Sequence, residues 1–468
     1  MRGGSWSEAL LIALFAAMVC FQVFVPPSLG MADNGDYARL IGRWGLGPWH
    51  PDPSDQYLYL TTEWIFDRQY YWSSDNFSSE LFPISAAALA GWLFNSYHFD
   101  IRVLGAIHAL LWVGSFAVFV VALRGMPGWT RWATGAAALV ILTDANYVAF
   151  CNSFYMDAGA FLFLGWAVAL WLLIVTRDRP TLWLFFAFAV AAAFCTLSKS
   201  QHAPLGLPLF ALGVVAAFCF RERSRRIGAL VLALTIPGAA CAEYISMPAT
   251  DARMPQYAVV FRKILERSPT PAADLAGLGL GPEYAQFIGK DRQPLSDVNA
   301  DEAWWAEFLR RTGRGNVLLF HLKHPGRTTA MMWWDLKVRG ADRQMHILGK
   351  YERASSYPAS TQARSFGWWT ALRSALIRVA PWHILVWLAA VLIVSTWVVL
   401  RERGTRAKTA ALALALSIMA IMEFAISSLS DAGETERHLF LFHVLTDFTI
   451  LCGVAWAAVA IRARRSSV

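Results

Sequence analysis

The chain alternates between long apolar stretches and short polar connections. Several apolar runs of about 20 residues are long enough to cross roughly 30 Å of hydrocarbon as a helix. The pattern predicts an all-α polytopic membrane protein with about ten transmembrane helices. The predicted spans cover roughly residues 8–29, 102–123, 132–149, 158–176, 180–198, 203–220, 227–246, 382–400, 409–428 and 438–461.

One further apolar run, "LFPISAAALAGWLFNSY" at 81–97, does not fit this series of spans. It is short, starts beside Pro83 and ends near Asn95 and His98. Counting it as a span would invert the orientation of every later connection. We therefore predict a juxtamembrane helix that lies against the outer leaflet. The alternative is a true span with the opposite topology.

Composition points to the same class of protein. The 468 residues are 56% hydrophobic and only 16% charged, whereas about a quarter of the residues in a soluble domain are charged. A net charge of +8 would suggest nucleic acid in a soluble chain, but here Lys and Arg sort around the spans, so we expect no nucleic-acid partner. The six cysteines lie in or beside apolar runs, which implies no disulfide framework.

The basic residues also indicate an orientation, because short connections rich in Lys and Arg stay cytoplasmic. With ten spans, every basic cluster falls on one side of the membrane. We therefore expect both termini in the cytoplasm and the unusual polar residues on the outer face. The clusters lie near Arg2, at 124–131, 177–179, 221–226 and 401–408, and in the tail at 462–467.

This layout divides the chain into three parts. Residues 1–246 would form an N-terminal transmembrane module of seven spans, with a first outer loop at 30–101. Residues 247–381 would form an extracytoplasmic helical loop domain, in which Pro and Gly separate stretches of helical spacing. Residues 382–468 would form a C-terminal module of three spans. No small-residue cleavage site clearly follows the first run, so we interpret it as a retained span.

Two carboxylates follow the first span directly, in "DNGDYARL" at 33–40. Asp33 and Asp36 are three residues apart and would share one face of a helix. They could simply cap a helix and interact with its dipole. Their place at the membrane surface favours a general base or a metal ligand instead. Trp64 and Tyr71 in the same loop offer flat faces for sugar rings, although such rings also anchor loops at the interface.

Polar residues gather in a second outer turn, "LSKSQHAP" at 197–204. Lys199 could simply extend toward the lipid headgroups. However, the turn is short and lies on the face that basic residues usually avoid, so Lys199 is placed to bind an anion. Phosphate is the natural candidate, with Gln201 and His202 donating further hydrogen bonds.

The last outer turn and the spans supply further candidates. Arg437 and His438 are placed to help bind a phosphate. Glu423, His443 and Asp447 lie inside spans, where ionisable groups are costly and usually functional, unless they form a buried structural pair. The candidates for substrate binding are Asn152, Tyr155, Asp157, Trp64, Tyr71 and Asp431.

Familiar nucleotide and hydrolase motifs are missing from the sequence. It contains no Gly-rich phosphate loop, zinc-ligand spacing or nucleophile elbow, so an ATP-driven or hydrolase function has no support. "MMWWDLKV" at 331–338 is similar to the Trp-Trp-Asp motif of oligosaccharyltransferases. The glycine that follows in that motif is absent here, so we interpret the match as coincidental.

Six segments that follow one another along nearly the whole chain carry a family resemblance. They are "DNGDYARL" (33–40), "NSFYMDAG" (152–159), "LSKSQHAPLG" (197–206), "HLKHPGR" (321–327), "LGKYERASSYP" (348–358) and "SDAGETERHLFLFHVLTD" (430–447). Their order resembles the GT-C class of integral-membrane glycosyltransferases and, more specifically, the bacterial glycan-biosynthesis hexose transferase (WsfD-like) family. Asp157 stands where this family leads us to expect glutamate, and Lys350 where it leads us to expect asparagine.

The resemblance implies a glycosyltransferase of surface-glycan assembly in the bacterial inner membrane, active on the outer face. It would move a hexosyl or pentosyl group, with inversion, from a polyprenyl-phosphate donor to an acceptor glycan, lipid or protein. Asp36 or Asp33 would be the general base, and Lys199, His202 and Arg437 would stabilise the leaving phosphate. Mg²⁺ or Mn²⁺ would suit the carboxylate oxygens, and the sequence leaves open whether a metal takes part.

Two other functions account for part of the same pattern. A transporter or flippase of lipid-linked sugars would explain the spans and the intramembrane Glu423 and Asp447, although neither inverted repeats nor broken midplane helices are visible. A glycan ligase or polymerase would share the outer-face chemistry and differ mainly in the size of its donor.

Overall fold

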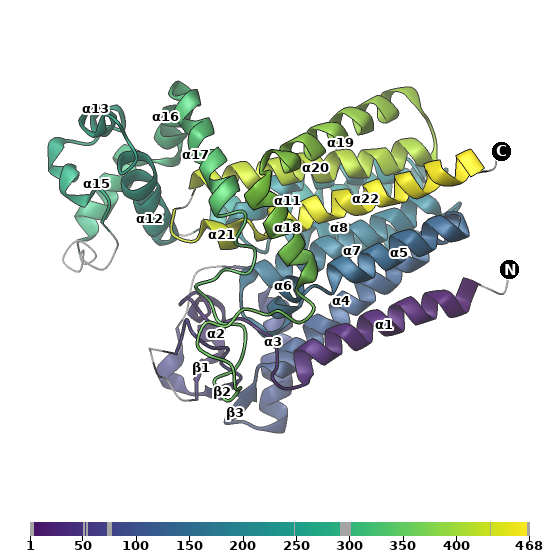
Figure 1. The fold of residues 1–468 in the computed structure, drawn as a ribbon, viewed down its shortest axis with the longest axis horizontal. Helices are drawn as coiled ribbons and strands as arrows, with labels where there is room; N and C mark the ends of the chain where they lie inside the picture. Colours follow the sequence, from purple (N-terminus) through teal and green to yellow (C-terminus); the bar gives the residue numbers. More distant parts are fainter. Residues whose placement is uncertain are drawn as a thin grey trace.

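The computed structural model describes residues 4–49, 52, 55–72, 77–247, 249–290, 301–430 and 432–465. The protein is an all-α polytopic membrane protein in which most helices run side by side in one bundle, with one small sheet outside it (Figure 1). Both ends of the chain lie at one end of this bundle, and α12 to α17 extend beyond the other end. The candidate Asp431 lies outside the described residues.

The bundle contains a helix at each predicted span. Within the described residues, eight helices are long and apolar enough to cross a membrane, and a bent pair would make a ninth. The remaining predicted span is the shorter α8 (Leu182–Thr196). The eight are α1 (Gly4–Phe24), α4 (Arg102–Ala122) with η3 (Leu123–Gly125), α7 (Met156–Thr176), η5 (Ser200–Leu205) with α9 (Gly206–Ala217), α10 (Arg223–Ala233) with α11 (Thr235–Ser246), α19 (Trp382–Arg401), α20 (Thr405–Ser430), and α21 (Thr435–His438) with α22 (Phe440–Arg465).

The third predicted span bends by 57°, where we expected one continuous helix. The bend separates α5 (Gly128–Leu142) from α6 (Ala145–Val148) and η4 (Ala149–Asn152). Asp144 caps the new helix, because its Oδ1 accepts a hydrogen bond from the backbone N–H of Asn146 at 3.0 Å. At the end of η4, the Asn152 amide donates to the carbonyls of Val23 (3.0 Å) and Leu29 (2.8 Å) and so holds the end of α1.

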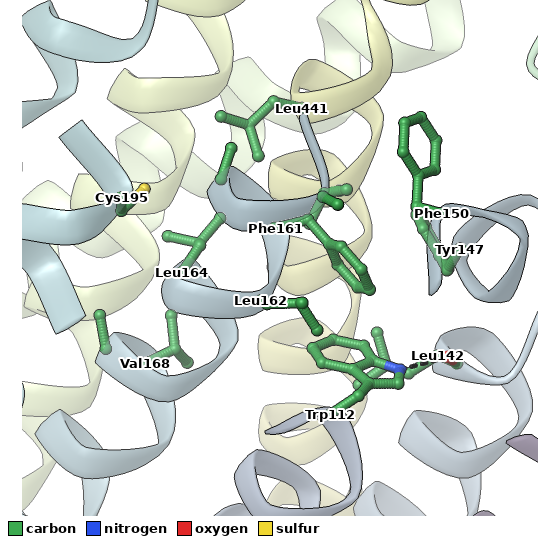
Figure 2. Packing of buried hydrophobic residues seen from close by; sticks show 14 of the residues in the cluster. Trp112, Leu142, Tyr147, Phe150, Phe161, Leu162, Leu164, Val168, Cys195 and Leu441 are labelled. Atoms are coloured by element: carbon green, nitrogen blue, oxygen red, sulfur yellow. Dashed lines mark hydrogen bonds between the residues drawn. The ribbon is translucent and has the colours of Figure 1, made fainter. Parts of the chain in front are cut away.

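Helix α7 lies at the centre of the bundle, with 89% of its span buried. Figure 2 shows Trp112 of α4 close to Leu162, and its indole N–H donates to the Leu142 carbonyl at 3.0 Å. Gly165 of α7 permits this close approach, since a Cβ there would lie 2.5 Å from the Trp112 ring. Close packing therefore fixes the position of α7 and, with it, of Asp157 in its first turn.

Residues 30–101, which we predicted to form the first outer loop and now call the first outer segment, contain a small antiparallel sheet that the sequence did not predict. Its strand order is β1-β2-β3, with Gly47 opposite Ile65 and Trp64 opposite Phe99. The strands have three or four residues each, too few for an alternating pattern to be recognised. The elements are α2 (Ala38–Ile41), η1 (Gly42–Trp44), β1 (Leu46–Pro48), β2 (Glu63–Phe66), η2 (Arg68–Tyr70), α3 (Leu81–Phe94) and β3 (His98–Asp100).

Helix α3 corresponds to the apolar run that we predicted to lie on the membrane surface. Its 14 residues rise only about 21 Å, which is short of the roughly 30 Å of the hydrocarbon core. Several of its large apolar side chains remain exposed on the protein, namely Phe82, Leu89, Trp92, Leu93 and Phe94. These features agree with a helix that rests against lipid and does not cross it.

A buried pair anchors α3 to α4. Glu80 directly precedes α3, and its Oε1 lies 2.8 Å from Nε2 of His108, with both side chains fully buried. The other ring nitrogen of His108 lies 2.9 Å from the Cys151 carbonyl. We expect Glu80→Ala to lower the free energy of unfolding by about 3–5 kcal/mol, because it leaves a buried imidazole without its partner. Denaturant unfolding in detergent measures this change.

The control for this prediction is Glu63→Ala, since Glu63 is exposed on β2. A surface substitution of this kind changes stability by about 0.5 kcal/mol or less. Equal losses for the Glu80 and Glu63 variants would contradict a structural role for the buried pair.

The described part of residues 247–381, the predicted extracytoplasmic loop domain, is mostly helical and has a hydrophobic core of its own, in which Phe261, Trp305 and Phe308 are fully buried. We call it the outer loop. Asp335, the acid of "MMWWDLKV", joins this core to the bundle: its carboxylate lies 2.8 Å from Lys263 Nζ and accepts a hydrogen bond from Ser428.

The domain boundaries stay a prediction. The helices are α12 (Ala249–Tyr257), η6 (Ala258–Leu265, a π-helix), α13 (Pro271–Gly277), η7 (Pro282–Phe287), α15 (Glu302–Thr312), α16 (Arg314–Lys323), α17 (Pro325–Val338) and α18 (Trp368–Val379).

Between α17 and α18 the chain returns to the first outer segment and supports it. The backbone N–H groups of Gly30 and Ala32 donate to the carbonyls of Lys350 and Gly349, both at 3.0 Å. Gly349 is required here, because a Cβ would lie 1.8 Å from the Leu58 carbonyl oxygen. The residues just before Asp33 are therefore held by a segment more than 300 positions away in the sequence.

Candidate active site

Charged side chains meet at the end of the bundle opposite the termini. Arg437 of α21 lies at their centre: its Nη2 contacts the Asp36 carboxylate, Nη1 lies 3.4 Å from Asp157 Oδ2, and Nε lies 2.8 Å from Glu434 Oε2. Lys199 completes the group, with its Nζ 3.4 Å from Asp157 Oδ1. We call these five residues the charged cluster. The fold thus brings together Asp36, Asp157, Lys199 and Arg437, which the sequence predicted as site residues.

Lys199 has neighbours on two helices, Asp157 of α7 and His438 of α21. Its Nζ lies 3.3 Å from Nδ1 of His438, and this nitrogen lies 2.6 Å from the Gln201 amide oxygen. Burial lowers the pKa of Lys199, and Asp157 opposes this effect. Its side chain is 14% exposed.

Asp36 is a paired carboxylate. Burial would raise its pKa, but Arg437, Arg39 and Lys199 outweigh burial and lower the pKa to about 2. Arg39 lies 3.4 Å from Asp36 Oδ1 and was not singled out from the sequence, although its spacing of three residues was a visible signal. The Asp36 side chain is 23% exposed and carries a negative charge in the resting protein.

Asp33, by contrast, organises the turn that carries Asp36. Its Oδ1 accepts from the backbone N–H groups of Gly35 (2.7 Å) and Tyr37 (3.2 Å), and its Oδ2 accepts from the Gln56 amide at 3.2 Å. Burial raises the pKa of Asp33 to about 6, and the hydrogen bonds from Tyr37 and Gly35 oppose this rise. Asp33 therefore holds the turn that precedes α2, whereas the N-cap position of that helix is Tyr37 and has no side-chain cap.

His202 and Gln201 connect the cluster to α20. His202 is fully buried, with Nδ1 2.8 Å from Glu423 Oε1 and Nε2 3.8 Å from Asp157 Oδ1. The Gln201 amide donates to Glu423 Oε2 at 2.8 Å and to Ser427 Oγ at 3.1 Å. Glu423, an acid within the predicted ninth span, therefore holds η5 in place through Gln201 and His202. His202 in turn contacts Asp157 and helps to fix its position.

Tyr155 supports the cluster from the other side. Its hydroxyl donates to the Ala32 carbonyl at 2.9 Å and accepts from the Asn34 backbone N–H at 3.0 Å. The Arg437 guanidinium carbon lies 4.9 Å from the centre of its ring, a cation–π contact. Through these contacts the buried Tyr155 orients Arg437 and the turn that carries Asp36.

A cavity of about 500 Å³ opens beside the charged cluster. Lys199, Gln201, His438 and Arg39 line one part of it, which we call the cationic end. The other lining side chains are mostly apolar and come from α7, α11, α12, α16 and α20. This volume lies within the range of about 300–1,000 Å³ that is usual for small-molecule sites.

None of the five predicted substrate-binding residues that the structure describes lines this cavity. Asp157 belongs to the charged cluster and Tyr155 packs against Arg437 of that cluster. Trp64 is buried and packs against Tyr37 and Phe154. Asn152 holds the end of α1, and Tyr71 is 64% exposed on the first outer segment. These assignments stay predictions without geometric support.

A second charged group, around Asp447 of α22, is fully buried. Asp447 Oδ2 lies 2.8 Å from Nη2 of Arg343 and accepts from the Trp369 indole N–H at 2.8 Å, while Oδ1 lies 3.3 Å from Nε of Arg373. Tyr147 of α6, labelled in Figure 2, also donates to Asp447. This group ties α22 to the outer loop and has the structural role that the sequence left open.

One set of metal-type ligands occurs in the described part of the chain. Oxygen and nitrogen atoms of Asp342, His346 and Glu436 lie within 4.8 Å of one another, but Arg339 already lies 3.2 Å from Glu436. In the charged cluster, Arg437 lies between the carboxylates of Asp36 and Asp157. Its guanidinium group therefore supplies the positive charge that these two acids share.

Comparison with known proteins assigns the chain to a family. A family model described as the YfdI N-terminal transmembrane domain matches residues 3–467. The chain belongs to this family. The match does not show the hexose transferase (WsfD-like) family that the sequence segments resemble, so that finer resemblance stays an expectation. A comparison with curated proteins gives no match.

Among solved structures, the chain is similar to the Archaeoglobus fulgidus oligosaccharyltransferase in its apo form. The identity is 11% and the TM-score 0.39, and the similarity covers 95% of this chain. The chain spans 50% of the length of that structure.

Proposed function

We propose that the protein is a membrane glycosyltransferase that moves a sugar from a polyprenyl-phosphate donor to an acceptor glycan, lipid or protein. The observation that carries this proposal is the cavity beside the charged cluster. The cationic end of the cavity suits a phosphate. Ile426 and Leu429 of α20 form part of its apolar wall. Tyr244 and Leu318 also line the cavity and are 58% and 56% exposed, so apolar surface continues from the cavity to the outside of the protein. An apolar chain that carries a sugar phosphate matches both features.

The chemistry follows from the groups in the cluster. The acceptor hydroxyl attacks the anomeric carbon and gives its proton to Asp36, while the bond from that carbon to the phosphate oxygen breaks. Lys199 and Arg437 stabilise the negative charge that develops on the leaving polyprenyl phosphate. Attack opposite to the leaving group inverts the anomeric centre.

The resting cluster also suggests how Asp36 becomes a competent base. A carboxylate with a pKa of about 2 is a weak base while Arg437 and Arg39 neutralise it. A bound phosphate would compete for Arg437, and the pKa of Asp36 would then rise toward its ordinary value. Binding of the donor would thus prepare the base for the acceptor.

An assay of the purified full chain separates this function from lipid-linked sugar transport. With a polyprenyl-phosphate hexose, a transferase releases polyprenyl phosphate when acceptor is added, whereas a flippase only moves the intact donor across the bilayer. Absence of release with every acceptor class, glycan, lipid and protein, together with movement of the donor would overturn the proposal.

Lys199→Met tests the phosphate contact directly. We expect donor binding to weaken about 10- to 100-fold, because the variant loses one charge-assisted hydrogen bond to the phosphate. A binding titration with polyprenyl-phosphate hexose measures the change. Lys337→Met is the matched control, since Lys337 is exposed on α17. An unchanged affinity of the Lys199 variant would contradict the assignment of the cationic end.

Cysteine labelling tests which side of the membrane the site faces. Gln69 and Arg403 are both exposed, the first in the outer segment and the second in the connection between α19 and α20. In a background without native cysteines, we expect Gln69→Cys to react with an impermeant reagent from outside and Arg403→Cys to react only after permeabilisation. The reverse pattern would show that the site faces the cytoplasm.

A further inference from the structure

Two buried polar side chains on the cavity wall have atoms without a partner. Glu243 of α11 and His321 of α16 both line the cavity and are 6% and 4% exposed. Neither Glu243 Oε2 nor His321 Nε2 has a hydrogen-bond partner among the residues that the structure describes. Buried polar atoms are normally satisfied, so these two call for a ligand.

Glu243 stands out from the helix that carries it. It is the single acidic residue of α11, and the following Tyr244 and Ile245 are 58% and 81% exposed on the outside of the bundle. A carboxylate in a membrane-spanning helix is costly and usually marks a functional site. Unlike these exposed neighbours, Glu243 is buried and lines the cavity.

The hydrogen bonds of His321 define what its free nitrogen can do. The Thr328 hydroxyl donates its one proton to the His321 carbonyl at 2.9 Å, so at 3.2 Å it accepts from the ring Nδ1–H. Burial, together with Lys263, lowers the pKa of His321 to about 4, and the ring is neutral at pH 7. In this tautomer Nε2 carries a lone pair and acts as an acceptor.

The cavity wall therefore carries the donors of the cationic end and, in addition, two acceptors, Glu243 and His321. An acceptor pair of this kind recognises hydroxyl groups, which are the donors of a carbohydrate ring. We propose that Glu243 and His321 bind hydroxyl groups of the sugar that the donor carries and help to select it. This inference rests on the proposed function, because it assumes that the phosphate of the same donor occupies the cationic end.

Two probes separate sugar contacts from phosphate contacts: a polyprenyl-phosphate hexose and the sugar-free polyprenyl phosphate. The full chain in detergent is titrated with each. We expect Glu243→Met and His321→Leu to weaken binding of the sugar-bearing probe about 10- to 100-fold and to leave the sugar-free probe unaffected. Lys199→Met should weaken binding of both probes. Ile245→Ala, on the exposed face of α11, is the matched control.

If the Glu243→Met variant fails to fold, Glu243→Gln replaces it, because glutamine keeps the shape of the side chain and removes its charge. We then expect a smaller loss of affinity, again confined to the sugar-bearing probe. Equal weakening of both probes, or of neither, by the Glu243 and His321 variants would overturn the inference while the function stands. If Lys199→Met changes neither probe, the proposed function fails instead, whatever the other variants do.

Discussion

Replacing Asp36 by Asn is expected to lower the rate of sugar transfer by a factor of about 10²–10⁴, which is the usual contribution of a general base. The variant keeps the shape of the side chain and removes its ability to take a proton. Arg437 still has Asp157 and Glu434 as partners, so the cluster should remain folded. Release of polyprenyl phosphate from the sugar donor in the presence of acceptor measures the rate.

The comparison with Asp33→Asn decides between the two acids. An amide oxygen at position 33 can still accept from the N–H groups of Gly35 and Tyr37, so the turn should persist. We expect this variant to retain most of its activity. If Asp33→Asn is inactive and Asp36→Asn is active, the roles that we assign to them are reversed. Full activity of both variants would remove the proposed base altogether.

The pH dependence of kcat/KM gives an independent test, because it reports the pKa values of the free enzyme. A base must be deprotonated to act. If Asp36 is the base, its pKa of about 2 places the acidic limb of the profile far below neutrality. We then expect kcat/KM to stay constant between pH 5 and 7. With Asp33 at a pKa of about 6, the value would instead fall as the pH drops through 6.

Replacing Arg437 by Lys is expected to lower kcat by about 10²–10³, the loss that follows removal of a preorganised donor from a developing anion. The guanidinium group reaches Asp36, Asp157 and Glu434 at once through three different nitrogens. An ammonium group is a single compact charge and cannot hold this arrangement, even though the charge is unchanged. Single-turnover kinetics separate the chemical step from donor binding.

Arg339→Lys is the matched control for this prediction. Arg339 also pairs with an acid of α21, since its Nη1 lies 3.2 Å from Glu436 Oε1, but it has no contact with Asp36 or Asp157 among the described residues. We expect it to leave kcat within about twofold of the original value, as most such substitutions near a surface have small effects. Similar losses for both variants would show that any disturbance of α21, and not the guanidinium of Arg437, lowers the rate.

The membrane class of the protein and the places of its spans were open to prediction from the sequence alone. A helix must bury its backbone hydrogen bonds within the bilayer, so a span leaves a local signature of about 20 apolar residues. The caps of the helices and the bend in the third span were harder to predict from the sequence. The bend beside Asp144 falls inside an apolar run, and the hydrogen bonds from Asn152 that hold the bent segment against the end of α1 form only in the folded chain.

Several site residues also carried a visible signal. Lys199 and Arg437 are basic residues on the face that we predict to be extracytoplasmic, which such residues usually avoid, and Asp36 follows soon after a predicted span. Glu243 carried a comparable signal as an acid within an apolar run, but nothing in the sequence shows that it faces a cavity. The orientation of a side chain around a helix depends on the neighbours that the helix acquires in the fold.

Hydropathy, which is a property of consecutive residues, determined where this chain enters and leaves the membrane. Contacts between residues that are distant in sequence decided the rest, as Asp36 and Arg437 illustrate across 401 positions. Asp33 and Asp36 have identical carboxyl groups, but the pKa of Asp33 is about 6 and that of Asp36 about 2. The difference comes from the burial, hydrogen bonds and charged neighbours of each group in the fold. That environment exists only once α7, α21 and the first outer segment have packed together.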